Sequence, residues 1–265
     1  MNGMVEMRRL YGEYVDGYRV DGELPPMMAL KLHHTDMVVA NAKAIAEGER
    51  MDAATAAACE LAALLHDTGR YEQIRVYNTF RDSDSVDHAV FSRDIVREKG
   101  WLDAHPHGGA ILDAILFHNR RDVPDGIDPF TAAVAHCTRD ADKLDIFRVL
   151  EERVATTDYR RDNAAFWNLP AIAKPSPEVL AAVRNSKPVD YQNIKTLADF
   201  VLIQVGWIRS ELHFATSRKL ASERGHLEFR RLFLAELTNG DADVDNLCRQ
   251  SPPDGPSQAA GIKNG

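Results

Sequence analysis

Cysteine, long apolar runs and a leader-like start are all scarce or missing in this sequence. Only three cysteines occur among 265 residues, at Cys59, Cys137 and Cys248, and their spacing is far too wide for a structural zinc site or a redox pair. We interpret them as reduced, buried thiols. No stretch approaches the roughly 18 uncharged apolar residues that a membrane span needs, and the first residues lack a basic region followed by an apolar one. We therefore expect a cytoplasmic protein without a membrane partner.

Positive charge is also in short supply. Lys and Arg total 32 against 40 Asp and Glu, so the formal net charge is -8, which argues against binding to extended nucleic acid. The pair Gly108-Gly109 and the isolated glycines do not form a phosphate-cradling loop with Lys and Ser or Thr, so the sequence does not support a nucleotide triphosphatase of the P-loop kind. With 45% hydrophobic and 27% charged residues, the composition is that of an ordinary globular protein.

Helical periodicity dominates what is present, and no series of alternating strands appears. The spacing of apolar residues predicts helices over 26–49, 53–65, 87–99, 109–119, 130–150, 196–212 and 215–237. Gly69 is suited to end the second of these, and turn-forming residues interrupt the pattern between 71 and 86. The proline-rich stretch 156–188 is less regular, and the polar residues 247–265 predict a disordered tail. We therefore expect an all-α bundle.

The residues hardest to explain by packing alone are His66 and Asp67, which follow the apolar helix predicted over 53–65. An imidazole and a carboxylate at the end of a buried helix, where water still has access, suit a catalytic divalent cation. Such a pair is also common by chance, and an exposed helix end is the alternative. Further candidate ligands lie on two other predicted helices: His33 and His34 on the first, and Asp140, Asp142 and Asp145 on the fifth.

These segments together resemble the HD-domain superfamily of metal-dependent phosphohydrolases. The matching motifs are Lys-x-x-His-Thr-x-x-Val around His34, Leu-Leu-His-Asp-x-Gly-Arg around His66 and Ala-Asp-Lys-Leu-Asp around Asp142. The resemblance covers roughly residues 26–150. It implies the metal ligands His34, His66, Asp67 and Asp142. His33 lies one residue off this pattern, and Asp140 and Asp145 compete with Asp142.

The resemblance also implies how the chain is organised. It predicts one HD-like helical domain over 1–246, with a motif core at about 26–150 and additional C-terminal helices in an extension at about 151–246. The extension carries no motif that indicates a substrate.

Three further side chains have counterparts in the superfamily. His88 and His118 resemble histidines that bind a second metal or the substrate phosphate in some branches, although a capping or core role is the alternative. If both take part, Asp67 bridges two cations and a hydroxide between them is the nucleophile. Arg70 resembles the Lys or Arg that lies near a phosphate, where a guanidinium makes two parallel hydrogen bonds. Its alternative is a surface salt bridge, for which Glu72 is one candidate partner.

The resemblance thus implies a hydrolase that cleaves a phosphomonoester or phosphodiester with a metal-activated water. The implied catalytic residues are Asp67, Arg70, His88 and His118, and the implied cofactor is one or two divalent ions of Mn, Fe, Co, Ni, Mg or Zn. The expected partner is a small phosphorylated molecule, for which a nucleotide is one candidate, and a homo-oligomer is compatible with the sequence. The alternatives are a di-iron oxygenase of the same superfamily, a non-catalytic metal- or nucleotide-binding module, and a helical interaction protein with an accidental likeness.

Overall fold

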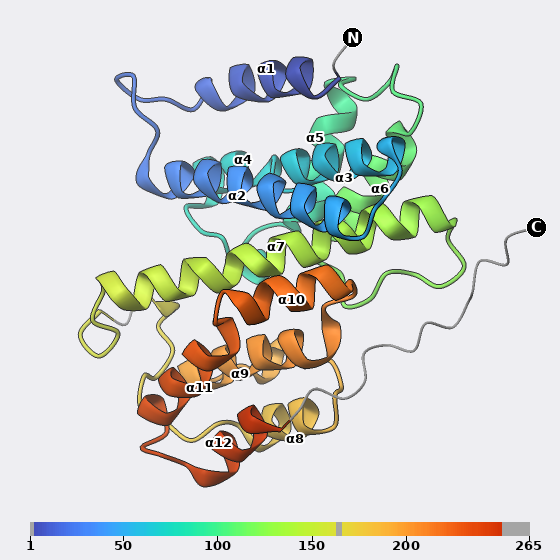
Figure 1. Ribbon diagram of the computed structural model, residues 1–265. Coiled ribbons are helices and arrows are strands. Elements are labelled where there is room, and N and C mark those ends of the chain that lie inside the picture. The colour runs from blue at the N-terminus through green and yellow to red at the C-terminus, as the bar shows by residue number, and fades with distance from the viewer. Residues whose placement is uncertain (1–2, 163–165, 251–265) are drawn as a thin grey trace, which may run out of the picture. The chain divides into compact units, whose positions relative to one another are not determined.

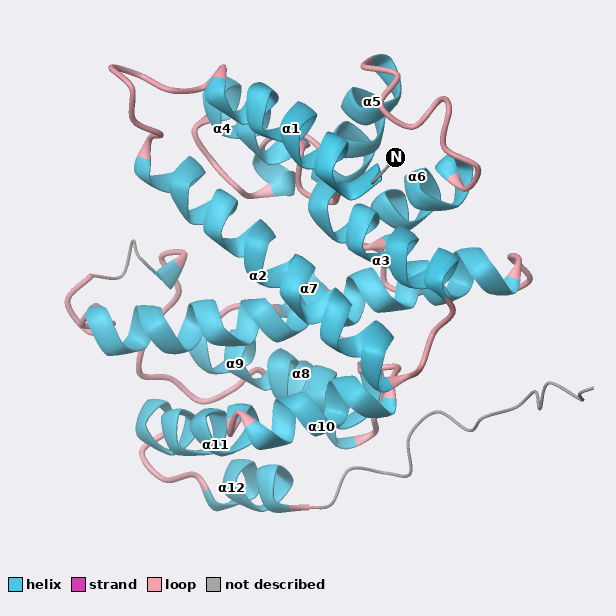
Figure 2. Cartoon of the chain, turned by 45° about the horizontal axis from the view of Figure 1, so that its top comes forward, coloured by secondary structure: helices cyan, strands magenta, loops and turns pink. Residues whose placement is uncertain are grey.

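The computed structural model describes residues 3–162 and 166–250. Within these ranges the regular structure is helical, apart from an isolated bridge between Val20 and Glu23, and the predicted all-α class is confirmed (Figure 2). The chain divides into two compact units, Met1–Asp145 and Ile146–Gly265. Helix α7 (Pro129–Thr156) crosses this boundary, and it also contains the predicted boundary between motif core and extension. The single domain expected over 1–246 stays a prediction.

The N-terminal unit is built around a buried central helix. Its elements are α1 (Gly3–Asp16), α2 (Pro26–Gly48), α3 (Ala53–Leu65), α4 (Gly69–Tyr77), the 3-10 turn η1 (Asp82–Asp84), α5 (His88–Glu98), α6 (Gly108–Phe117) and the first part of α7 (Figure 1). Helix α3 contacts α1, α2 and α6. The Asp52 carboxylate caps α3 by accepting hydrogen bonds from the backbone N–H groups of Ala54 and Thr55. All residues from 61 to 65 are buried, and His66 and Asp67, which follow α3, therefore lie in the interior as well.

Helix α4 lies where an irregular stretch was predicted. Gly69 does not end the preceding helix but begins α4, which continues to Tyr77. The buried residues Tyr71, Gln73 and Ile74 belong to a helix that contacts α2 and α5. Helix α4 is therefore stabilised by tertiary packing, to which periodicity in the sequence is only a partial guide.

The C-terminal unit contains the remainder of α7 and a second group of helices. These are α8 (Pro177–Arg184), the 3-10 turn η3 (Tyr191–Asn193), α9 (Leu197–Gly206), the π-helical turn η4 (Trp207–Glu211), α10 (Ala215–Glu223), α11 (His226–Leu237) and α12 (Ala242–Arg249). Helix α9 contacts α8 and α11. The helix predicted over 215–237 is interrupted at Gly225, whose φ of 70° separates α10 from α11. Helix α8 forms within the stretch expected to be irregular.

Two further sequence expectations concern the C-terminus and the membrane. Helix α12 continues to Arg249 and buries Leu247 and Cys248, so the first residues of the expected tail are helical because their apolar side chains reach the core. Residues 251–265 of that tail lie outside the described residues. In the described part of the chain, no helix combines the length and apolar character needed to cross a membrane.

Candidate metal centre

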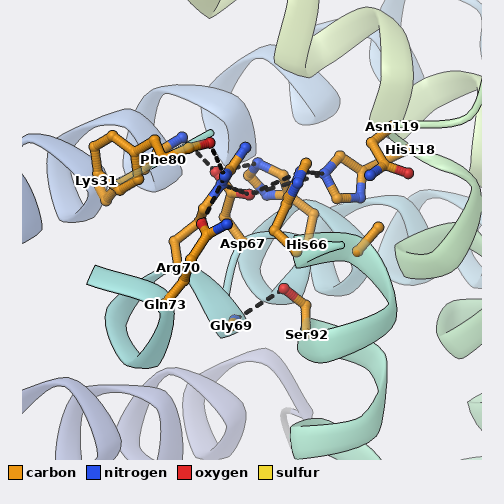
Figure 3. Close-up of polar contacts among 12 residues, drawn as sticks. Lys31, His66, Asp67, Gly69, Arg70, Gln73, Phe80, Ser92, His118 and Asn119 are labelled. Carbon is orange, nitrogen blue, oxygen red and sulfur yellow. Dashed lines mark hydrogen bonds and ion pairs between the residues drawn. The ribbon is translucent and has the colours of Figure 1, made fainter. Parts of the chain in front are cut away.

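Histidine and aspartate side chains from five helices of the N-terminal unit meet in its interior. His34 lies within α2, and Asp142 lies within α7. His66 and Asp67 follow the last residue of α3, His88 is the first residue of α5, and His118 follows the last residue of α6. The exposed fraction of each of these histidines and of Asp67 is 7% or less. The structure thus brings together six of the seven residues predicted for the site, including His66, Asp67 and His118 in Figure 3.

One group of ligand atoms lies between α2, α3 and α7. The distance from His34 Nε2 to Asp142 Oδ1 is 3.1 Å, and that from His66 Nε2 to the same oxygen is 3.8 Å. Asp67 Oδ2 lies 3.6 Å from His34 Nε2 and 3.4 Å from His66 Nε2. We call His34, His66, Asp142 and Asp67 Oδ2 the first subsite.

A second group surrounds the other oxygen of the same carboxylate. Asp67 Oδ1 lies 3.7 Å from His88 Nε2 and 3.8 Å from His118 Nε2. The two imidazole nitrogens are 2.9 Å apart. We call His88, His118 and Asp67 Oδ1 the second subsite. Asp67 therefore presents one oxygen to each subsite, which is the arrangement of a carboxylate that bridges two cations.

Main-chain carbonyls orient two of the imidazoles. The Nδ1 atom of His66 lies 2.8 Å from the carbonyl oxygen of Ala63, and that of His118 lies 2.6 Å from the carbonyl oxygen of Ile115. A carbonyl oxygen only accepts hydrogen bonds, so Nδ1 carries the proton in both rings. Each Nε2 atom therefore presents a lone pair to the site, as in histidines that bind metal.

Carboxylates orient the other two imidazoles. His34 Nδ1 lies 2.6 Å from Asp145 Oδ2, and His88 Nδ1 lies 2.5 Å from Asp82 Oδ2. Asp142 and Asp145 were both candidate ligands on α7. Asp142 faces the other ligand atoms, whereas Asp145 accepts a hydrogen bond from the Nδ1 atom of His34. The second arrangement is the carboxylate–histidine pair that commonly supports a metal ligand.

The electrostatics of the first subsite favour positive charge. Burial alone raises the pKa of Asp67, but Lys31 and His66 outweigh it and hold that pKa well below its ordinary value. Burial is likewise outweighed at Asp142, where the nearby imidazoles of His34 and His66 lower the pKa. Burial and Lys31 lower the pKa of His34, but Asp142 and Asp145 raise it above its ordinary value overall. The carboxylates are therefore anionic and attract cations.

The second subsite consists of neutral imidazoles beside that anion. Burial, with the neighbouring imidazoles of His88 and His66, lowers the pKa of His118 to about 3. Burial and Arg70 lower the pKa of His88, although Asp82 and Asp67 oppose the shift. Neutral imidazole is the form of histidine that binds metal.

Unsatisfied atoms provide a test of whether a cation fits these residues. Within the described residues, His34 Nε2, His66 Nε2 and Asp67 Oδ1 are buried without a hydrogen-bond partner. Leaving a buried polar atom unpaired costs about 1–3 kcal/mol. The facing lone pairs of His88 and His118 repel each other, whereas two nitrogens bound to one cation at about 2.1 Å lie about 3.0–3.4 Å apart, depending on the coordination angle. The residues present therefore fit one divalent cation in each subsite.

Lys31 is a neighbour of the site that the sequence reasoning missed. Its Nζ atom donates a hydrogen bond of 2.6 Å to Asp67 Oδ2, and its side chain is 17% exposed (Figure 3). Lys31 precedes His34 by about one helical turn, so both side chains lie on the same face of α2. That spacing is the sequence signal that could have identified it.

Arg70 lies beside Asp67, but most of its described bonds go to the segment before α5. Its guanidinium donates hydrogen bonds to Gln73 Oε1 (2.7 Å), the carbonyl oxygen of Phe80 (2.7 Å) and Asp82 Oδ1 (3.0 Å). Its Nε atom lies 3.4 Å from Asp67 Oδ1. The alternative of a salt bridge with Glu72 is wrong, because Glu72 instead accepts hydrogen bonds from Arg75 and Tyr18.

The fold and the site together define an all-helical domain with a convergent cluster of histidines and aspartates. A family model described as HD domain matches residues 32–146, which span every predicted ligand. This part of the chain is therefore similar to HD domains. No curated protein and no solved structure matched the chain.

Proposed function

We propose that this protein is a metal-dependent phosphohydrolase that cleaves a small phosphomonoester or phosphodiester, with nucleotides among the candidate substrates. The observation that supports this most directly is the convergence of imidazole nitrogens, each with its Nδ1 atom anchored, on the two oxygens of Asp67. The match to an HD domain adds to it, because the superfamily consists mostly of metal-dependent phosphohydrolases. The cofactor is one or two divalent ions.

The residues of the site have distinct proposed roles in holding the cations. His34, His66 and Asp142 would hold a first cation, and His88 and His118 would hold a second, with Asp67 available to both. Bound cations supply a water activated at neutral pH and positive charge against the phosphoryl oxygens. Because the four imidazoles are anchored by carbonyls and carboxylates, they require little reorganisation when the substrate binds.

Lys31 and Arg70 place additional positive charge next to the same carboxylate. The Lys31 ammonium group is partly exposed, so it is accessible to an incoming anion and can form a charge-assisted hydrogen bond with a phosphoryl oxygen. The guanidinium of Arg70 is mostly buried and bonded to the segment 80–82, and its Nε atom has no hydrogen-bond partner among the described residues. We assign Lys31 to direct contact with the substrate and Arg70 to positioning Asp67.

Elemental analysis and a substrate screen on the full chain test this proposal. The purified protein is incubated with phosphomonoesters, phosphodiesters and nucleotides in the presence of Mn²⁺, Co²⁺, Ni²⁺ or Mg²⁺. We expect bound metal and phosphate release that a chelator abolishes. Asp67→Ala should lose both metal and turnover while circular dichroism shows unchanged helicity. Asp36→Ala is the matched control, because Asp36 is exposed on α2 and pairs only with Arg8 among the contacts described.

The same experiment distinguishes the alternatives. Turnover by Asp67→Ala would refute the proposed mechanism. A product formed only in the presence of O₂ would identify the di-iron oxygenase instead. Bound metal without turnover of any substrate in the panel would favour the non-catalytic binding module, and absence of bound metal would leave the helical interaction protein.

A further inference from the structure

The four imidazoles of the site are not anchored equally. His66 and His118 are held by carbonyls one turn earlier in the chain, Ala63 within α3 and Ile115 within α6. His34 is held by a carboxylate of α7 that is 1% exposed. These anchors belong to the helical core, so they exist as soon as the unit is folded. His88 is the exception, because its anchor lies outside the long helices.

Asp82, which anchors His88, lies in η1, within the segment 78–87 that connects α4 to α5. Its side chain is 32% exposed, in contrast to the carboxylate behind His34. Asp82 is itself held by two side chains of α4: Arg70 donates to its Oδ1 at 3.0 Å, and so does Gln73 Nε2 at 3.0 Å. The orientation of His88 therefore depends on hydrogen bonds from α4 to one partly exposed loop residue.

Gln73 secures the rest of the same segment. Its side chain is fully buried, and its Nε2 atom lies within hydrogen-bond distance of Ser85 Oγ at 2.8 Å and the carbonyl oxygen of Val86 at 3.1 Å. The backbone of the segment thus keeps its contacts with α4 even without the Asp82 carboxylate. Removing that carboxylate should release the imidazole of His88 rather than unfold the segment.

The neighbouring Asp87 does not replace Asp82 as the anchor. Asp87 lies close enough to Asp82 and His88 for the three to form a possible cation-binding group. Its oxygens, however, cap the N-terminus of α5 and accept hydrogen bonds from Asn119 at 3.0 Å and Arg120 at 2.6 Å. This carboxylate therefore joins the start of α5 to the end of α6.

We propose that Asp82 is a positioning residue that sets the occupancy of the second subsite, so that the two subsites differ in affinity. The first subsite is preformed by the helical core, whereas the second is complete only when Asp82 holds His88. The inference rests on the cation-binding part of the proposed function. Loss of a carboxylate that orients a metal-binding histidine typically weakens binding by about 10- to 100-fold. We expect this loss at the second subsite alone.

Titration of the metal-free full chain with Mn²⁺ tests the inference without measuring activity. The wild type should bind two ions per chain, the first more tightly. Asp82→Ala should bind the first with unchanged affinity and the second at least about 10-fold more weakly. It should also lose the spin coupling between two Mn²⁺ ions in electron paramagnetic resonance. Asp82→Asn, which retains an oxygen acceptor for His88, should fall between the two.

Asp84→Ala is the matched control. Asp84 belongs to the same turn η1, its side chain is 50% exposed, and it lies 3.4 Å from Arg81 rather than next to a histidine. It should bind both ions as the wild type does. Wild-type affinity of Asp82→Ala for both ions would overturn the inference, and so would an equal loss at both subsites.

The outcomes also separate this inference from the proposed function. If the wild-type chain bound only one ion, the inference that Asp82 sets the occupancy of a second subsite would be overturned. The proposed phosphohydrolase function, with a single cation, would remain possible. Conversely, selective loss of the second ion in Asp82→Ala would support the inference even if no substrate in the panel were hydrolysed.

Discussion

Helices α4 and α5 approach each other closely at Gly69, and this contact leads to a quantitative prediction. The Gly69 N–H donates a hydrogen bond of 2.8 Å to Ser92 Oγ, which joins the start of α4 to α5 (Figure 3). A Cβ atom at position 69 would lie 2.7 Å from the backbone nitrogen of Ser92 and 3.0 Å from the carbonyl carbon of Phe91. Ordinary contacts begin near 3.4 Å, so Gly69→Ala requires α5 to retreat by about 0.7 Å.

The free-energy cost follows from the stiffness of packed helices. Both close atoms belong to the backbone of α5, so no side-chain rotation relieves the contact. Overpacking of this kind costs about 1–3 kcal/mol, which lowers the melting temperature by several degrees in a chain of this size. His88 begins the displaced helix, and a binding site tolerates errors of only about 0.5 Å in its side chains. Gly69→Ala should therefore also weaken the second subsite.

Thermal unfolding and Mn²⁺ titration check both parts of this prediction. Gly109→Ala is the control, because an added Cβ there has no neighbour within 4 Å and alanine favours the helix over glycine by up to about 1 kcal/mol. It should match or exceed the stability of the wild type. If Gly69→Ala were as stable as Gly109→Ala and bound both ions normally, the close approach of α4 and α5 would not hold.

Two further substitutions probe the first subsite. Asp145→Asn should weaken Mn²⁺ binding at the first subsite by about 10- to 100-fold, because the imidazole of His34 loses its anionic partner. An unchanged affinity in the titration would refute the role of Asp145 in orienting His34. Lys31→Met should lower kcat/KM for the best phosphate ester by about 10- to 100-fold at unchanged metal content, since a hydrogen bond to a charged group contributes about 1.5–3 kcal/mol. Lys43→Met, an exposed change on the same helix, should leave kcat/KM unaltered.

Periodicity predicted the helices that bury an apolar face or are apolar throughout. The helix expected over 53–65 coincides with α3, and that expected over 26–49 ends one residue beyond α2. Helix α4 was missed because its buried positions include a glutamine and a tyrosine, which resemble surface residues in the sequence. Helix α1 received no prediction, although Met7, Tyr11 and Val15 are buried at a spacing of one helical turn.

The amino-acid sequence by itself determined the fold class and the candidate ligands, because helical spacing and short motifs are local properties of the chain. Only the tertiary structure decided what each carboxylate does. Asp142 and Asp145 lie three residues apart on α7, yet one faces the ligand atoms and the other supports His34. The partnership of Asp82 with His88 also emerged only in three dimensions. Such roles depend on the directions in which side chains from separate helices point, and packing sets those directions.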